Sequence, residues 1–274
     1  MPNFVYDIPL NDLATYFAVV AVLAIVIGML IVKPLLRLLM GSGSNLNEAI
    51  GYGTSAFSLF YGLLLGLLTV AAYQNSERVK QAILSEATAI SAFYSDMNMY
   101  PEPIRSDLKE MLRDYVLFTI YKEWPAHRKG EFLDGGTNRA NAVRQRLATF
   151  EPRTESQKII HAEVINNFQT FIQARQQRLM GVITAIPDVL WYAVLVGAAI
   201  NILLLVALRM PLRQQFVLGT TTAFFLGVIL FVIVALDRPL RGVSGLDPGP
   251  IQLLWDRQMI WDEPLADFGS RAHG

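Results

Sequence analysis

The sequence predicts an all-α integral membrane protein with four transmembrane helices and a helical extramembrane bundle between the second and the third. Of its 274 residues, 53% are apolar and only 17% are charged, whereas typical soluble chains carry about 25% charge. The apolar residues gather in four blocks, each near the ~20 residues that a bilayer core requires. We therefore expect a hairpin over 1–76, a helical domain over 77–186, a second hairpin over 187–236 and a C-terminal loop and short helix over 237–274.

The first hairpin is predicted from two charge-free runs. Leu13–Val32 holds 20 residues without a charge, and Ala49–Ser76 carries no charge either. The apolar centre of the second run places a membrane helix at about Gly53–Tyr73. Because the first run lacks a basic segment in front and is longer than a signal-peptide core, we expect it to stay in the protein.

The second hairpin follows the same pattern. Val189–Leu208 and Gln214–Leu236 are apolar runs bounded by charged residues, with a very short turn around Pro211. Two helices joined by so short a turn are predicted to cross the membrane in opposite directions.

The segment from Glu77 to Arg178 holds 15 Lys and Arg against 13 Asp and Glu, which is the surface of a water-exposed domain. The second membrane helix meets no breaker before Tyr100-Pro101, so it is predicted to run on into water as a stalk. Apolar residues then recur at helical spacing from Ile104, which predicts an amphipathic helix that ends near Trp124-Pro125.

Two more helices complete the predicted bundle. A short one covers about Asn138–Phe150. Thr154 and Gln157 have the spacing of a capping box, which predicts that a long helix begins there and leads toward the third span. After the fourth span, a short helix carries Trp255 and Trp261. These tryptophans fit the membrane interface or packing against the helical domain, and both placements stay open.

Few residues are suited to catalysis. The chain has no cysteine, its net charge is zero, and His127, His161 and His273 are not spaced as metal ligands. Nucleophile motifs and phosphate-binding glycine loops are missing as well. We therefore expect no enzyme, no metal, no cofactor and no nucleic-acid partner.

The second span carries a row of small or hydroxyl-bearing residues at spacings of three or four, which puts them on one helical face. They are Ser55, Ser58, Gly62, Gly66, Thr69, Tyr73 and Ser76. Two interpretations compete. Gly62 and Gly66 fit close helix packing; alternatively, several copies surround an axis, and Ser55, Ser58, Gly62, Gly66, Thr69 and Tyr73 line a pore for permeant ions.

No acidic or basic residue lies within the predicted spans, so proton relays that need such groups are disfavoured. A conduit here would rely on hydroxyl groups and backbone dipoles. Asn201 and Thr220-Thr221-Thr222 are interpreted as helix-to-helix hydrogen bonds rather than as ligands.

Most of the chain resembles the bacterial bestrophin-like family of unknown function. The residues that carry this resemblance are Gly62–Leu68, Glu86-Ala87, Glu123-Trp124-Pro125, Arg175, Arg178, Pro187, Trp191, Leu236-Asp237-Arg238-Pro239 and Arg241-Gly242. This chain departs from the family pattern just past the second span. The family pattern leads us to expect an aromatic residue and an acid there, and this chain has Tyr73-Gln74.

The resemblance implies two membrane hairpins around a helical region. Bestrophins proper are pentameric anion channels whose second helices line the pore, and they hold the helical region in the cytoplasm. The charge pattern indicates the opposite orientation, because Lys33, Arg37, Arg209 and Arg213 flank the short loops while Asp7 and Asp12 precede the first span. Six basic residues flank the spans on the side of the helical domain, against four beside the short loops, and this raw count favours the opposite orientation. Giving the short loops more weight, we expect the amino terminus outside a bacterial inner membrane.

The sequence therefore predicts a homo-oligomeric ion channel in the lipid bilayer, with anion conduction and a pentamer implied by the resemblance. One alternative is a membrane-anchored sensor or scaffold whose helical domain binds a partner. Another is a stator-like proton channel subunit.

Overall fold

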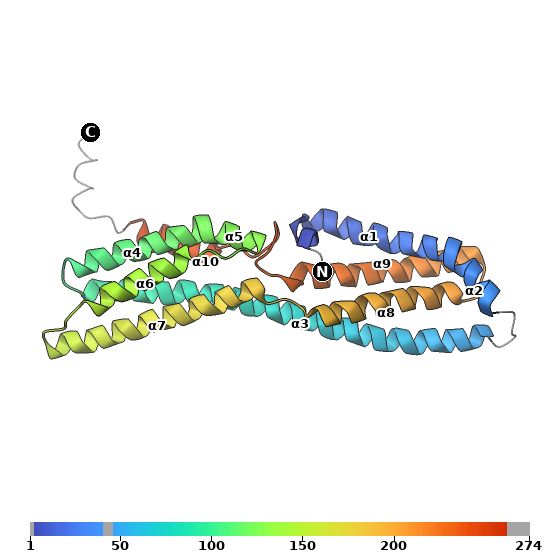
Figure 1. The fold of residues 1–274 in the computed structure, drawn as a ribbon, viewed down its shortest axis with the longest axis horizontal. Coiled ribbons are helices and arrows are strands. Elements are labelled where there is room, and N and C mark those ends of the chain that lie inside the picture. Colours follow the sequence, from blue (N-terminus) through green and yellow to red (C-terminus); the bar gives the residue numbers. More distant parts are fainter. Residues whose placement is uncertain (1–2, 41–45, 262–274) are drawn as a thin grey trace, which may run out of the picture. The chain divides into compact units, whose positions relative to one another are not determined.

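A computed structural model describes residues 3–40 and 46–261, and its regular elements in these ranges are all helical. Figure 1 shows them. The chain divides into two compact units. The membrane unit is Met1–Ser76, Thr184–Arg238 and Gly242–Ser244, and the helical unit is Glu77–Ile183, Pro239–Arg241 and Gly245–Gly274.

The membrane unit contains the predicted spans. The first span is α1 (Leu10–Ile27), which continues through a π-helical turn (Gly28–Val32) into α2 (Lys33–Met40). The second lies in α3 (Leu46–Asp96), a helix of 51 residues that continues into the helical unit, as the lack of a breaker predicts. The third and fourth are α8 (Asp188–Ala207) and α9 (Leu212–Asp237). In the described part of the chain, four helices are long and apolar enough to cross a membrane, which confirms the predicted fold class.

The helical segment that holds the first span runs on to Leu36 and so includes Lys33, just past the predicted bound at Val32. Lys33 is buried and donates to the side-chain oxygen of Gln215 on α9. The Gln215 amide nitrogen in turn donates to the Val206 carbonyl at 2.9 Å, at the end of α8. A buried ammonium needs such partners in an apolar setting.

Small residues of α9 allow α1 to pack closely against it (Figure 1). A Cβ at Gly227 would lie 3.0 Å from the Phe17 carbonyl oxygen, and one at Gly219 would lie 3.1 Å from the Ile25 side chain. In membranes, where lipid is as apolar as leucine, close approach at small residues drives helix association.

The helical unit begins with the second part of α3 and a short 3₁₀ turn (Met97–Met99), followed by α4 (Ile104–Phe118). The predicted end of this helix near Trp124-Pro125 is wrong. A π-helical turn (Thr119–Glu123) joins α4 to α5 (Trp124–Lys129), which ends at Gly130. Proline is tolerated in the first turn of a helix, and Gly130 adopts the left-handed conformation (φ 78°) that suits a helix end.

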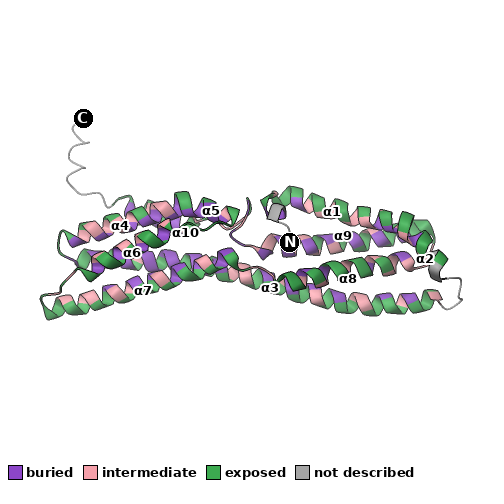
Figure 2. Ribbon diagram, in the orientation of Figure 1, coloured by how far each residue is buried: buried purple, intermediate pink, exposed green. Residues whose placement is uncertain are grey.

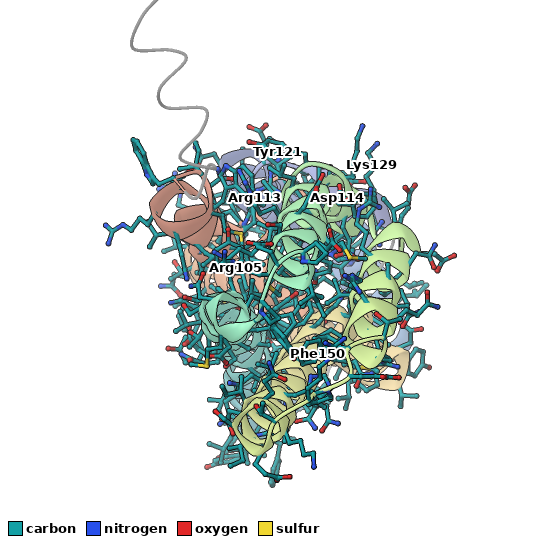
Figure 3. All side chains as sticks on the ribbon, turned by 90° about the vertical axis from the view of Figure 1, so that its left-hand side faces the viewer. Arg105, Arg113, Asp114, Tyr121, Lys129 and Phe150 are labelled. Carbon is teal, nitrogen blue, oxygen red and sulfur yellow. The ribbon has the colours of Figure 1, made fainter. Side chains whose placement is uncertain are left out.

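The bundle is completed by α6 (Gly135–Ala148) and α7 (Glu155–Ile183). The Thr154 hydroxyl accepts from the Gln157 backbone N–H at 3.2 Å, and the Gln157 side chain accepts from the Arg153 N–H at 2.8 Å. The second half of the predicted capping box is therefore shifted by one residue, and the helix still begins where predicted. Figure 3 views this unit from one end, with Tyr121 and Lys129 at its periphery.

The C-terminal helix α10 (Gly249–Leu254) and a π-helical turn (Trp255–Met259) pack against the helical unit. Ile251 and Met259 are fully buried in its core, and Trp255 packs against that core beneath the Arg113 guanidinium, 5.5 Å from the ring centroid. Trp261 is exposed. Of the two placements that the sequence leaves open, Trp255 adopts the one within the helical domain.

Candidate functional site

The six candidate pore-lining residues lie along one edge of α3, and the chain itself leaves most of them open. Ser55, Gly62, Gly66 and Tyr73 are exposed, whereas Ser58 and Thr69 are half-buried. Figure 2 shows exposed residues along the part of α3 beside α8. The Ser55 and Thr69 hydroxyls donate to carbonyls of the preceding turn, at 3.0 and 2.8 Å. Their oxygens keep lone pairs toward the open side.

The glycines of this edge have no packing neighbour from another helix among the described residues. A Cβ built at Gly62 or Gly66 would meet nothing within 4 Å. The close approach between α3 and α8 occurs elsewhere, at Gly197, where a Cβ would collide with the Tyr61 ring. The Tyr61 hydroxyl donates to the Val194 carbonyl at 2.8 Å. Gly62 and Gly66 therefore do not serve helix packing within one copy.

Ser58 lies where the open edge meets the packed face of α3. Its oxygen accepts from the Asn201 amide on α8 at 3.0 Å, the helix-to-helix bond predicted for Asn201. The threonine cluster behaves differently. Thr221 and Thr222 each donate to a carbonyl of their own helix at 2.9 Å, so for these two the predicted bond to another helix is wrong.

Large apolar side chains adjoin the open edge. Leu59, Leu63 and Leu67 are all more than 60% exposed, and they follow one another on the next face of α3. The exposed arc of this helix therefore has two parts: an edge of small and hydroxyl residues, and a ridge of leucines. The small-residue edge can face water or pack closely against another helix. The leucine ridge can face lipid or pack against an apolar surface.

The helical unit holds a second cluster of interest, made of buried ion pairs from three segments. Arg178 on α7 donates to Glu86 on α3 and to Glu123 in the π-helical turn, the latter at 2.9 Å. Arg175 donates to the other oxygen of Glu123 at 2.8 Å. All four side chains are no more than 6% exposed. Two guanidinium groups thus neutralise two carboxylates away from water, as buried charges require.

Polar and aromatic groups enclose the cluster. The Tyr115 hydroxyl donates to Glu86 at 2.6 Å, and Arg178 lies over the Trp124 ring at 5.1 Å. Burial raises the pKa of Tyr115, and Glu86 raises it further. Burial alone would lower the pKa of Arg178, but the adjacent Glu86 raises it. Tyr115 therefore stays neutral and Arg178 stays charged across the physiological pH range.

His127 on α5 completes the arrangement as a neutral group. Its Nδ1 lies 3.2 Å from an Arg178 nitrogen, and because arginine only donates, Nδ1 is the acceptor. Burial lowers the pKa of His127 to about 3, and Arg178 adds to the effect. Its Nε2 is buried without a hydrogen-bond partner among the described residues.

Gly136 leaves room for this cluster. A Cβ there would lie 2.5 Å from a Glu123 carboxylate oxygen and 2.7 Å from an Arg175 nitrogen. The first turn of α6 can therefore approach the ion pairs only because residue 136 has no side chain.

A third arrangement joins the ends of the membrane unit. Asp237, at the end of α9, accepts from the Tyr6 hydroxyl at 2.5 Å and from the Ile186 N–H at 2.6 Å. The Arg238 guanidinium lies 5.0 Å from the centroid of the Tyr6 ring. Gly242 has φ 77°, and a Cβ there would overlap the Tyr6 carbonyl oxygen. The start of the chain is thereby tied to the entry of α8 and the exit of α9.

The ion-pair cluster is not among the sites predicted from the sequence, although one acidic residue on an apolar helix face indicates it. Glu86 lies three residues after Ile83 and four before Ile90, on the apolar face of the stalk. A carboxylate at such a position needs a buried cation.

The other two histidines take no part in this cluster. His161 bonds Tyr100 at 2.5 Å, and His273 lies outside the described residues. No group suited to a metal ion occurs in residues 3–40 and 46–261.

Comparison with known proteins now identifies the family. The model of the bestrophin-like domain matches residues 19–251. The chain belongs to the bestrophin-like family. The match spans both units, so the open edge of α3, the ion-pair cluster and Asp237 all lie within the bestrophin-like domain. The resemblance drawn from the sequence is confirmed.

Solved structures show the same fold for this bestrophin-like protein. A single-residue variant of a bacterial bestrophin homologue from Klebsiella pneumoniae has a TM-score of 0.68, with 10% identity over 91% of this chain and 99% of that one. A second structure of a Klebsiella pneumoniae homologue has a TM-score of 0.63, with 12% identity over 91% and 99%. A variant described as a membrane protein has a TM-score of 0.68, with 10% identity over the same shares. None of the curated proteins matches the chain.

Proposed function

We propose that this bestrophin-like protein is an oligomeric ion channel whose α3 helices line a shared pore. Membership of the family and the likeness to bacterial bestrophin homologues support the proposal. The observation that carries it is the open edge of α3. A Cβ at Gly62 or Gly66 would meet no atom of the described chain within 4 Å, although small residues in a membrane helix ordinarily serve close packing.

Several copies around an axis would account for both parts of the exposed arc. The small edge would face the axis, where Ser55, Thr69 and Tyr73 offer hydroxyl groups to passing ions. The leucine ridge of Leu59, Leu63 and Leu67 would then pack against the neighbouring copy. Such a lining carries no charge of its own, so permeant ions would be coordinated by dipoles. Pentamers and anion conduction are the forms that the family resemblance favours.

The ion-pair cluster suits a supporting role in this proposal. It fixes α3, α7 and the π-helical turn before α5 to one another through buried charge, and α3 is the helix that would line the pore. We infer that the cluster keeps the stalk of α3 rigid beyond its membrane part.

The test is the conductance of the purified full-length protein in planar bilayers. Gly66→Leu adds a large side chain to the open edge and should lower the unitary conductance severalfold or abolish it. Ala71→Leu adds a large side chain at an exposed position on another face of the same helix and should leave the conductance unchanged. Silence of the wild-type oligomer, or equal conductance in all three proteins, would contradict the proposal and favour a membrane-anchored sensor or scaffold.

A further inference from the structure

The helical unit has an open groove between α6 and α7. It has a volume of about 330 Å³ and is lined by apolar side chains and by three polar ones, Arg144, Gln169 and Gln173. Leu147 and Phe168 form a buried floor, and Ile165 and Ile172 lie half-buried beside them. Ligand sites in proteins measure about 300 to 1,000 Å³ and combine mostly apolar walls with a few polar groups. This groove has the size and the lining of a site for a small amphiphile.

Arg144 gives the groove its charge. Its guanidinium lies 5.8 Å from the Phe168 ring centroid and has no carboxylate partner among the described residues. Arg139 and Arg146 on the same helix do have such partners, Asp114 at 2.7 Å and Asp107 at 2.8 Å. Gln169 and Gln173, which lie one turn apart on α7, make no side-chain hydrogen bond within the described ranges. The groove therefore presents an unneutralised cation and two amides beside an apolar floor.

We propose that this groove binds the anion of a medium-chain carboxylic acid. The carboxylate would pair with the Arg144 guanidinium, whose planar fork matches two carboxylate oxygens, and the amides of Gln169 and Gln173 would supply further donors. The alkyl chain would cover Leu147 and Phe168. A cationic amphiphile would meet Arg144 with like charge and is excluded. The site lies within the helical unit, so the proposal stands whether or not the protein conducts ions.

The test is a titration of the full-length protein in lipid nanodiscs with hexanoate, octanoate and decanoate, measured by calorimetry and corrected with empty nanodiscs. We expect saturable binding whose affinity rises about fourfold for each added methylene. Octyltrimethylammonium should not bind. Heat that is the same with and without the protein, or affinity that ignores chain length, would overturn the proposal.

Variants locate the site. Arg144→Gln should weaken octanoate binding at least tenfold, and Ala148→Phe, which fills the groove from its exposed rim, should abolish it. Arg153→Gln removes another exposed arginine outside the groove and should leave binding unchanged. If octanoate does not bind and Arg144→Gln instead alters the size of the oligomer, the groove is an interface between copies and the proposal is wrong. Unchanged melting temperatures show that the variants fold.

Discussion

Arg178 on α7 and Glu86 on α3 lie 92 residues apart in the chain, yet the guanidinium donates to the carboxylate from two nitrogens, with both side chains fully buried. This pair, with Glu123 as a second acceptor, joins two long helices of the unit in its interior. Breaking a buried pair leaves a charge without compensation and is strongly destabilising. We therefore expect substitutions in this cluster to lower the free energy of unfolding.

Replacing Arg178 by Met keeps the apolar stem but removes the charge. Glu86 and Glu123 would then lose donors in a buried site, and we expect a loss of about 3–5 kcal/mol in the free energy of unfolding. Equilibrium denaturation followed by circular dichroism measures it. Arg139→Met is the matched control, because its partner Asp114 is largely exposed and surface pairs contribute about 1 kcal/mol or less. Equal losses of unfolding free energy for the two variants would show that the buried ion pairs stabilise the protein no more than a surface pair does.

His127 predicts a pH dependence of stability. Its pKa is lowered to about 3 in the folded protein, against about 6.5 in an unfolded chain. Below pH 6.5 the unfolded state therefore binds more protons, and stability falls as the pH drops toward 3, by roughly 1 kcal/mol per pH unit. His127→Gln keeps an acceptor for Arg178 without this titration, so its stability should fall less between pH 7 and pH 5. Identical pH profiles for wild type and variant would contradict the assignment of His127 as a buried neutral group.

Gly136 tests how tightly α6 approaches the ion pairs. In Gly136→Ala the new methyl group would clash with Glu123 and Arg175, and we expect a loss of about 1–3 kcal/mol. Asn141→Ala, on an exposed face of the same helix, should change stability by no more than about 0.5 kcal/mol. Thermal melts of both variants give the comparison. A neutral Gly136→Ala would mean that α6 and the cluster are further apart than the structure places them.

Asp237 predicts a role in holding the membrane unit together. Asp237→Ala leaves the buried Tyr6 hydroxyl and the half-buried Ile186 N–H without their acceptor, and a buried donor left unsatisfied costs about 1–3 kcal/mol. Loss of stability and faster proteolysis of the amino-terminal segment are the expected results. Asp7→Ala removes an exposed acid next to Tyr6 in the sequence; it serves as the control and should behave as wild type.

The sequence predicts the spans, the continuous α3 and the start of α7 well, because each depends on local properties. Charge-free length defines the spans, and the absence of a breaker defines the stalk. The end of the helix at Pro125 is mispredicted, since a π-helical turn before a proline is not visible in apolar periodicity. The helix of the first span also runs on beyond its charge-free run to Leu36, and Lys33 there donates a hydrogen bond to the Gln215 side chain on α9, a contact between distant residues that local patterns do not show.

The ion-pair cluster shows what local reasoning misses. Glu123, Arg175 and Arg178 stand out in the sequence as residues that carry the family resemblance, and Glu86 stands out also as an acid on the apolar face of the stalk. Their partners, however, are set by how distant helices of the unit pack. The open edge of α3 is different. Its small residues are recognised at once from their spacing, whereas the surface that they face lies outside the contacts of a single chain.

Because the chain has no cysteine, single cysteines report cleanly on what that edge faces. The most direct measurement is the effect of a charged, membrane-impermeant thiol reagent on currents from Gly62→Cys, Gly66→Cys and Thr69→Cys, compared with Leu63→Cys and Leu67→Cys. We predict that the reagent blocks current through the first three variants and leaves the two leucine variants conducting. Block of the leucine variants alone, with the small-residue edge unreactive, would contradict the account.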